Sequence, residues 1–175
     1  AGGSYDASVA ESNSAKLLMG LIDELKQAYQ VDENRVYLMG QSFGGYGTWD
    51  LITRHPETFA AAVPMCGAGC LDRAEAVTDM PLLVLHGSAD PTVPVSGSRE
   101  MVDAIREAGG ELVTYLEYEG DDHYVQRRLF EQPELWMDWL FAQEKGVTAQ
   151  APDVSSCFMP ETTLNLNSSG QLDQL

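Results

Sequence analysis

The sequence predicts an α/β protein with a mostly parallel sheet flanked by helices. Four apolar, strand-like runs lie at residues 35–39, 60–65, 81–86 and 112–118, and segments with helical character separate them. Strands that alternate with helices in this way are typical of a parallel sheet. The first run leads into Gly-x-Ser-x-Gly at residues 40–44, with helix formers after it. A strand, a sharp turn and a helix are the context in which this motif acts.

The helices are predicted in chain order from periodicity and stop signals. A first helix runs from about Ser14 to Tyr29 and places one apolar stripe against the core, made of Leu17, Leu18, Leu21, Ile22 and Leu25. A second runs from Phe43 to Arg54 and is stopped by Pro56. A third, near 98–108, ends at two glycines. The last stretch, 124–145, is divided by Pro133.

Length and composition predict one catalytic domain at residues 1–145, followed by a linker or surface tail at 146–175 that is rich in Ser, Asn, Gln and Thr. The net charge is −17, from 27 acidic and 10 basic residues. Nucleic acids and anionic membranes bind basic patches, so this charge argues against both partners. No long apolar span is present in the sequence.

The three cysteines, Cys66, Cys70 and Cys157, do not predict a metal site. Cys66-x-x-x-Cys70 lacks the second ligand pair that a zinc site needs. It forms either a short disulfide or two buried thiols, and Cys157 is an alternative partner for both. We therefore expect no metal and no organic cofactor.

Ser42 is the candidate nucleophile. A serine hydroxyl attacks only when it is exposed, rigid and beside a base, and a sharp strand-to-helix turn gives it the exposure. We expect Gly40 and Gly44 to leave room for that turn. The N–H of Phe43 at the following helix N-terminus is the predicted oxyanion-hole donor. Gln41 and Tyr46, beside the serine, are predicted to contact substrate.

His123 is the candidate base among three histidines. It follows the strand-like run 112–118 and a short loop, which is where a base lies in an open α/β sheet. His55 is predicted to lie at the end of the second helix, where the helix dipole favours it. His86 ends a buried strand, so it is either a hydrogen-bonded structural residue or part of the pocket floor.

Asp90 is the candidate acid that orients the base. It lies after the strand at 81–86, in a loop restrained by Pro91 and Pro94, and the order Ser, Asp, His fits a hydrolase triad. The alternative interpretation is a turn cap, because Asp-Pro is a common turn signal. Asp121 and Asp122 are rival acids, but they adjoin His123 in sequence and are poorly placed to orient its ring.

These motifs are similar to those of the α/β-hydrolase superfamily, and in particular of its secreted esterase and polyhydroxybutyrate-depolymerase group. The resemblance spans about residues 15 to 143 and rests on the segments 31–37, 40–50, 54–64, 86–90, 93–94 and 120–123. It implies Ser42 as nucleophile, Asp90 as acid and His123 as base. It also implies a secreted or periplasmic location.

The resemblance further implies a sheet of about eight strands, of which the four strand candidates match the fifth to the eighth. The first half of the sheet, and the loop that donates the second oxyanion-hole N–H, are then missing. Such a sheet would have an open edge at residues 36–39, and open edges pair with other chains. We expect an incomplete chain that is completed by a preceding segment or by self-association.

The predicted function is a serine carboxylic-ester hydrolase that acts on a small-molecule or polymer ester through an acyl-enzyme. A serine peptidase of the prolyl-oligopeptidase type is the alternative, because it uses the same three residues. A second alternative, from another class, is a binding fragment that keeps a hydrolase fold without its activity.

Overall fold

The computed structural model describes residues 5–131, 133–147, 163–166 and 172–173 of the 175-residue chain. The first half holds α1 (Asn13–Ala28), β1 (Tyr37–Gln41), α2 (Phe43–Arg54), β2 (Ala61–Met65) and the 3-10 helix η1 (Leu71–Val77). The second half holds β3 (Leu82–Gly87), α3 (Ser96–Glu107), β4 (Val113–Tyr118), α4 (Arg127–Glu131), α5 (Pro133–Ala142), β5 (Thr163–Leu166) and β6 (Leu172–Asp173).

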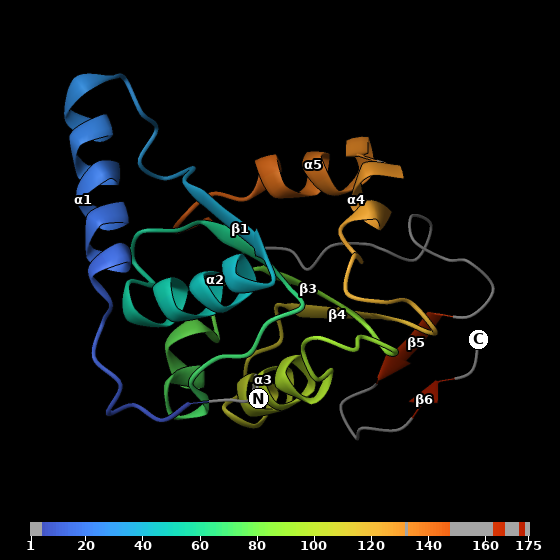
Figure 1. Cartoon of the computed structure of the whole chain (residues 1–175). Coiled ribbons are helices and arrows are strands. Elements are labelled where there is room, and N and C mark those ends of the chain that lie inside the picture. The colour runs from blue at the N-terminus through green and yellow to red at the C-terminus, as the bar shows by residue number, and fades with distance from the viewer. Residues whose placement is uncertain (1–4, 132, 148–162, 167–171, 174–175) are drawn as a thin grey trace.

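One sheet runs in the order β1-β2-β3-β4-β5-β6 (Figure 1). β1 to β4 are parallel, which confirms the predicted fold class and the four predicted strands. β5 and β6 are antiparallel additions, and β5 joins the sheet by pairing Leu164 with Glu117 of β4. Both short strands fall in the segment that was predicted to be a linker or surface tail, so they were not predicted. The domain boundary at residue 145 stays a prediction.

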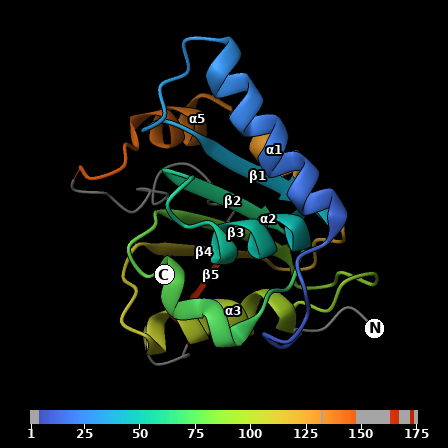
Figure 2. The ribbon, with the colours of Figure 1, turned by 90° about the vertical axis from the view of Figure 1, so that its left-hand side faces the viewer.

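Two apolar layers cover the sheet, one on each face. Alternating side chains of β2, β3 and β4 point to opposite faces, as the two-residue period of a strand requires. α1, α2, α3 and η1 pack on one face around the buried Trp49, and α4 and α5 pack on the other around the buried Leu129 (Figures 1 and 2). Pro133 separates α4 from α5, as predicted.

The predicted apolar stripe of α1 is wrong at its four leucines and right at Ile22, which packs against the core. Leu17, Leu18, Leu21 and Leu25 are exposed, and Leu17 keeps 74% of its surface. The inward face combines Ile22 with Ala15 and Met19, which were not part of the predicted stripe. α1 lies at the β1 end of the sheet beside α2 (Figure 2), and no described segment covers its outer face. The N-cap of the helix lies two residues earlier than predicted, because Ser12 rather than Ser14 caps it by accepting from the Ala15 N–H.

β1 forms the open edge of the sheet that the resemblance implied. Its residues are only partly buried, and Met39 is exposed. The exposed leucines of α1 lie at the same end of the molecule, so this end presents apolar side chains and unpaired strand backbone together. What covers it, a preceding segment or a second copy, stays a prediction. None of the helices within the described ranges is both long enough and apolar enough to cross a membrane.

A buried carboxylate, Glu117 on β4, is held by two side chains. Arg99 of α3 binds it through both its Nε (2.8 Å) and its Nη2, and the Tyr115 hydroxyl donates to it at 2.8 Å. Burial alone would raise the pKa of Glu117, but the bonds from Arg99 and Tyr115 outweigh it, so this pKa is lowered. The network ties α3 to β4 of the sheet.

Glu117→Gln should lower the free energy of unfolding by about 1–2 kcal/mol at pH 7, because Arg99 and Tyr115 lose a charged acceptor. A carboxyl whose pKa is lowered by folding stabilises the protein at pH values above its unfolded pKa of about 4.3. This contribution is lost progressively as the pH falls from there through the lower pKa of the folded state. The difference between wild type and Glu117→Gln should therefore shrink between pH 7 and about pH 3.

Urea unfolding of both proteins at the two pH values measures this difference. Glu107→Gln is the matched control, because Glu107 is exposed on the same helix as Arg99. It should change the free energy of unfolding by less than about 0.5 kcal/mol. A deficit of Glu117→Gln that stays constant or grows toward acid pH would contradict the ionised state assigned to Glu117.

Candidate active site

Ser42 occupies a sharp turn between β1 and α2. Its backbone has φ 61° and ψ −118°, one of two positive-φ angles among the described non-glycine residues, and it is the N-cap of α2. Such angles are costly for a residue with a side chain and persist only where the surroundings fix them. Here the Ser42 N–H donates to the Met65 carbonyl of β2 at 3.0 Å, and the Ser42 carbonyl accepts from Tyr46.

The turn depends on glycine at Gly40 and Gly45. A Cβ on Gly40 would lie 2.3 Å from the Gly44 carbonyl oxygen, and one on Gly45 would lie 2.2 Å from the Met65 carbonyl oxygen. A Cβ on Gly44 would meet nothing within 4 Å. The expected need for room at Gly40 is therefore confirmed. At the other side of the serine the close contact falls on Gly45 and not on Gly44.

Gly45→Ala should destabilise the fold by about 1–3 kcal/mol or more, because backbone would have to move away from backbone to admit the methyl group. Gly44→Ala is the matched control one residue away, and it should leave stability unchanged or raise it slightly by helix propensity. Thermal unfolding of the two variants beside wild type measures the difference. Equal unfolding midpoints for Gly45→Ala and Gly44→Ala would show that α2 can shift on β2 without cost.

The structure brings Ser42, His123 and Asp90 into one hydrogen-bonded chain. The Ser42 Oγ lies 2.8 Å from His123 Nε2, and His123 Nδ1 lies 2.7 Å from Asp90 Oδ2. Ser42 follows β1, Asp90 lies in the loop after β3, and His123 lies in the loop after β4. The three loops meet because the carboxyl ends of parallel strands share one edge of the sheet.

The Asp90 carboxylate is fully buried, with no exposed side-chain surface. Its Oδ1 accepts from the N–H groups of Thr92 and Val93 at 2.8 and 2.9 Å. Burial would raise the pKa of Asp90, but the bonds from His123, Val93 and Thr92 together outweigh it and lower this pKa. The carboxylate is therefore ionised and aimed at the imidazole at neutral pH.

The other titratable candidates have partners of their own. Asp121 forms two hydrogen bonds of 2.8 Å with Arg128, and Asp122 pairs with Arg127 at 3.2 Å. His55 lies at the C-terminal end of α2, as predicted, and its Nε2 lies 2.8 Å from Glu11. The rival acids are thus turned toward arginines rather than toward His123.

Three further predicted residues surround Ser42 in different ways. Phe43 is the first residue of α2, where an N–H has no partner within its own helix, and the residue is 93% exposed. The Gln41 amide donates to the His123 carbonyl at 2.7 Å and so fastens the His123 loop to β1. Tyr46 is half-buried, and its hydroxyl is a buried group without a hydrogen-bond partner in the described part of the chain. Substrate contacts of Gln41 and Tyr46 stay predictions.

Cys66 and Cys70 are buried free thiols, which settles the alternative of a short disulfide between them. Cys157 lies outside the described residues. Donor atoms of Cys66, Asp90 and His123 lie within 4.8 Å of one another, the one such group of three in the ranges that the structure describes. Burial raises the pKa of the Cys66 thiol to about 12, and a neutral thiol is a poor metal ligand.

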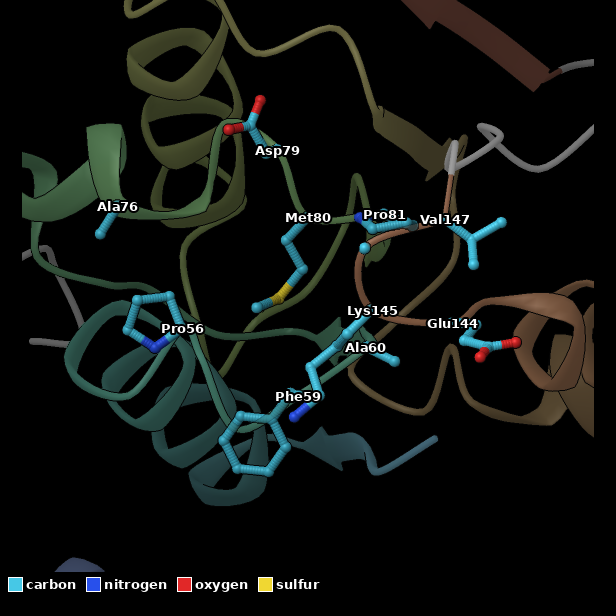
Figure 3. A pocket seen from close by; sticks show the side chains of 11 residues that line it. Pro56, Phe59, Ala60, Ala76, Asp79, Met80, Pro81, Glu144, Lys145 and Val147 are labelled. Atoms are coloured by element: carbon cyan, nitrogen blue, oxygen red, sulfur yellow. The ribbon is translucent and has the colours of Figure 1, made fainter. Parts of the chain in front are cut away.

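Two cavities lie outside this chain of residues. One, of about 200 Å³, is lined by Phe59, Met80, Pro81 and Lys145 among others (Figure 3). It opens at the amino ends of β2 and β3, opposite the edge that carries Ser42. The other, of about 250 Å³, lies between α2 and the segment before α1, with Tyr5 and Tyr46 in its wall.

Known protein families and a solved structure are similar to this chain in sequence and in fold. A sequence profile described as the prolyl oligopeptidase family matches residues 10–79, and one described as TAP-like protein matches residues 55–128. A solved structure described as a thermostable esterase superimposes with a TM-score of 0.73 at 39% identity over 77% of this chain. The chain belongs to the α/β-hydrolase superfamily.

Curated relatives of this α/β-hydrolase include esterases. A putative esterase, NocK, of Nocardia uniformis subsp. tsuyamanensis is 35% identical over 79 residues, which are 44% of this chain and 23% of NocK. A bifunctional acetylxylan esterase/xylanase, XynS20E, of Neocallimastix patriciarum is 33% identical over 70 residues, 40% of this chain and 10% of that protein. The chain covers 37% of the thermostable esterase. It thus spans well under half of each of these proteins.

Cys66 and His86 lie beside Asp90, and neither was predicted to contact it. Cys66 directly follows β2, and His86 is the penultimate residue of β3. A signal for both was present in the sequence, because polar residues at the carboxyl ends of parallel strands converge at the same edge as the nucleophile.

Proposed function

We propose that this α/β-hydrolase is a serine carboxylic-ester hydrolase that acts through Ser42, His123 and Asp90 and forms an acyl-enzyme. The supporting observation is the hydrogen-bonded chain from the Ser42 Oγ through both nitrogens of His123 to Asp90. It joins a nucleophile, a base and an orienting acid in the arrangement that acyl transfer requires. The esterase names among the relatives favour an ester substrate.

In the proposed mechanism, Nε2 of His123 takes the proton from the Ser42 hydroxyl as the oxygen attacks the ester carbonyl carbon. Asp90 accepts the Nδ1–H bond, which leaves Nε2 free to accept that proton, and its charge stabilises the imidazolium that forms. The imidazolium then protonates the departing alcohol. Water attacks the acyl-enzyme with His123 again as base, which releases the acid and restores Ser42.

The Phe43 N–H supplies one donor to the oxyanion in this proposal, at the positive end of the α2 dipole. The second donor is expected from the part of the fold that the resemblance implies before β1. One missing donor lowers turnover by about a hundredfold or more. We therefore expect the 175-residue chain by itself to acylate more slowly than a chain that carries the whole sheet.

The test compares the hydrolysis of short-chain esters with that of peptide amides. We expect p-nitrophenyl acetate and butyrate to be hydrolysed much faster than peptide p-nitroanilides, and a fluorophosphonate probe to label Ser42. The prolyl oligopeptidase profile match is the specific observation in favour of a peptidase. Preferential cleavage of the anilides would establish that alternative. If the probe fails to label Ser42 both in this chain and in one that carries the whole sheet, only a binding role would remain.

The subgroup, the location and the polymer substrate are part of the same proposal. Membership of the secreted polyhydroxybutyrate-depolymerase group, a secreted or periplasmic location and a polymer ester as substrate are proposed from the sequence motifs. Release of soluble acid from a polyester film by the protein that carries the whole sheet would test the polymer substrate directly.

A further inference from the structure

His86 is a buried histidine that the proposed mechanism does not use. It lies near the carboxyl end of β3, with no exposed surface, below the loop that carries Asp90. Its Nδ1 lies 2.8 Å from the Ser98 Oγ at the start of α3. Its Nε2 lies 3.1 Å from the Val93 carbonyl oxygen and 3.4 Å from Asp90 Oδ2. The imidazole therefore touches both the acid and the loop that holds it.

These contacts define which nitrogen of His86 carries the proton. The Val93 carbonyl only accepts hydrogen bonds, and so does the Asp90 carboxylate, so Nε2 must be the donor. In a neutral ring Nδ1 then accepts from the Ser98 hydroxyl. That hydroxyl has one hydrogen, and the Gly67 carbonyl oxygen lies farther from it, at 3.2 Å. The shorter contact, to Nδ1, is the one that the neutral tautomer needs.

The charges around His86 come from three elements. Asp90 faces it from the acid loop, Glu117 lies opposite it in the register of β4, and His123 faces it from the base loop. Burial lowers the pKa of His86, and it outweighs the opposite effects of the bond to Val93 and of the two carboxylates. Glu117 is already paired with Arg99. His86 is thus a neutral donor rather than a counter-ion.

Val93 links the two groups through its peptide. Its N–H donates to Asp90 Oδ1, and its carbonyl accepts from His86 Nε2. We propose that His86 is a positioning residue for Asp90, whose Nε2–H fixes the Val93 turn and faces Oδ2, so that the carboxylate stays aimed at His123. This inference rests on the proposed function, because it gives His86 a role only through Asp90.

Two near-isosteric variants separate the two nitrogens of His86. The amide nitrogen of Gln reaches the place of Nε2, whereas that of Asn reaches only the place of Nδ1. We expect His86→Gln to keep ester turnover within about tenfold of wild type. His86→Asn should lower kcat by about 10- to 100-fold, as a small displacement of a catalytic group does, with KM changed less than about threefold. His55→Gln is the control, because His55 binds Glu11 instead.

A double-mutant cycle with Asp90→Asn distinguishes positioning from a general structural role. If His86 acts through Asp90, His86→Asn should cost little further activity once the carboxylate is gone. Losses that multiply independently would overturn the proposal. So would wild-type turnover in His86→Asn.

Histidine nitrogen NMR on the 175-residue chain tests the same inference without turnover. We expect His86 to carry its proton on Nε2 at pH 7, and His86→Asn to move the resonance of the His123 Nδ1–H while His55 stays unchanged. If His86→Asn does not fold, the wild-type spectrum still decides, because a proton on Nδ1 or a charged ring would overturn the proposal. If NMR shows the expected His86 tautomer but the fluorophosphonate probe fails to label Ser42, the result would count against the proposed function and not against this inference.

Discussion

Ser42→Ala should abolish labelling by a fluorophosphonate probe and lower ester hydrolysis to the background rate, a loss of about 10⁶-fold if the chemical step limits turnover. The reason is that no other described hydroxyl is shown within hydrogen-bond distance of His123 Nε2. The variant should fold normally. Ser42 makes no side-chain capping bond to α2, so the lost hydroxyl removes no contact that stabilises the helix. Alanine also adopts the same backbone angles at the same cost.

Ser12→Ala is the matched control for this prediction. Ser12 caps α1 through its side chain, so its loss should cost about 1 kcal/mol of stability while labelling stays at the wild-type rate. The two variants should thus give opposite results in thermal unfolding and in probe labelling. Labelling of Ser42→Ala at the wild-type rate would show that another nucleophile reacts.

The strands and most helix boundaries could be predicted from local signals. β2 and β3 are short apolar runs buried on both faces, and this burial leaves little choice of register. α2 follows directly from the motif before it and from Pro56 after it, and both of its predicted ends are confirmed. Such signals act within a few residues, and sequence reasoning is sound at that range.

The errors came from features that depend on distant segments. The leucines of α1 have helical spacing, but spacing does not tell which face meets the sheet, and in this structure the face of Ala15, Met19 and Ile22 does. The close contact at Gly45 involves Met65, twenty residues later on a neighbouring strand. β5 is only four residues long and gains its place by pairing with β4, so its own sequence carried little signal.

The meeting of Ser42, Asp90 and His123 could be predicted because chain order and strand ends limit where three loops can meet. The surroundings of Asp90 could not be predicted in the same way. The distances from Asp90 to His86 and to the N–H of Val93 depend on how the loop after β3 turns over α3. That turn is set by Ser98 and Gly97, which approach the Gly67–Ala68 segment too closely for any larger residue at Gly97.

Asp90→Asn should slow ester turnover by about 10⁴-fold with little change in KM. The N–H groups of Thr92 and Val93 both point at Oδ1, so the amide oxygen of Asn should take that position and its NH₂ should face His123. That NH₂ donates to Nδ1 and so forces the imidazole proton onto Nε2, where it faces the Ser42 hydroxyl. His123 then has no lone pair with which to accept the serine proton.

The control for this variant is Asp122→Asn, which makes the same chemical change beside His123 in sequence. Asp122 pairs with Arg127 at the surface, so turnover should stay within about a factor of two of wild type. Steady-state turnover measured over a range of pH distinguishes the two outcomes. A wrong tautomer lowers the maximal rate of the pH–rate profile, and it does not shift the acid limb of that profile. Full turnover in Asp90→Asn combined with a large loss in Asp122→Asn would assign the role of the acid to Asp122. The geometry disfavours that assignment, because the Asp122 carboxylate accepts from Arg127 and from the Tyr124 N–H.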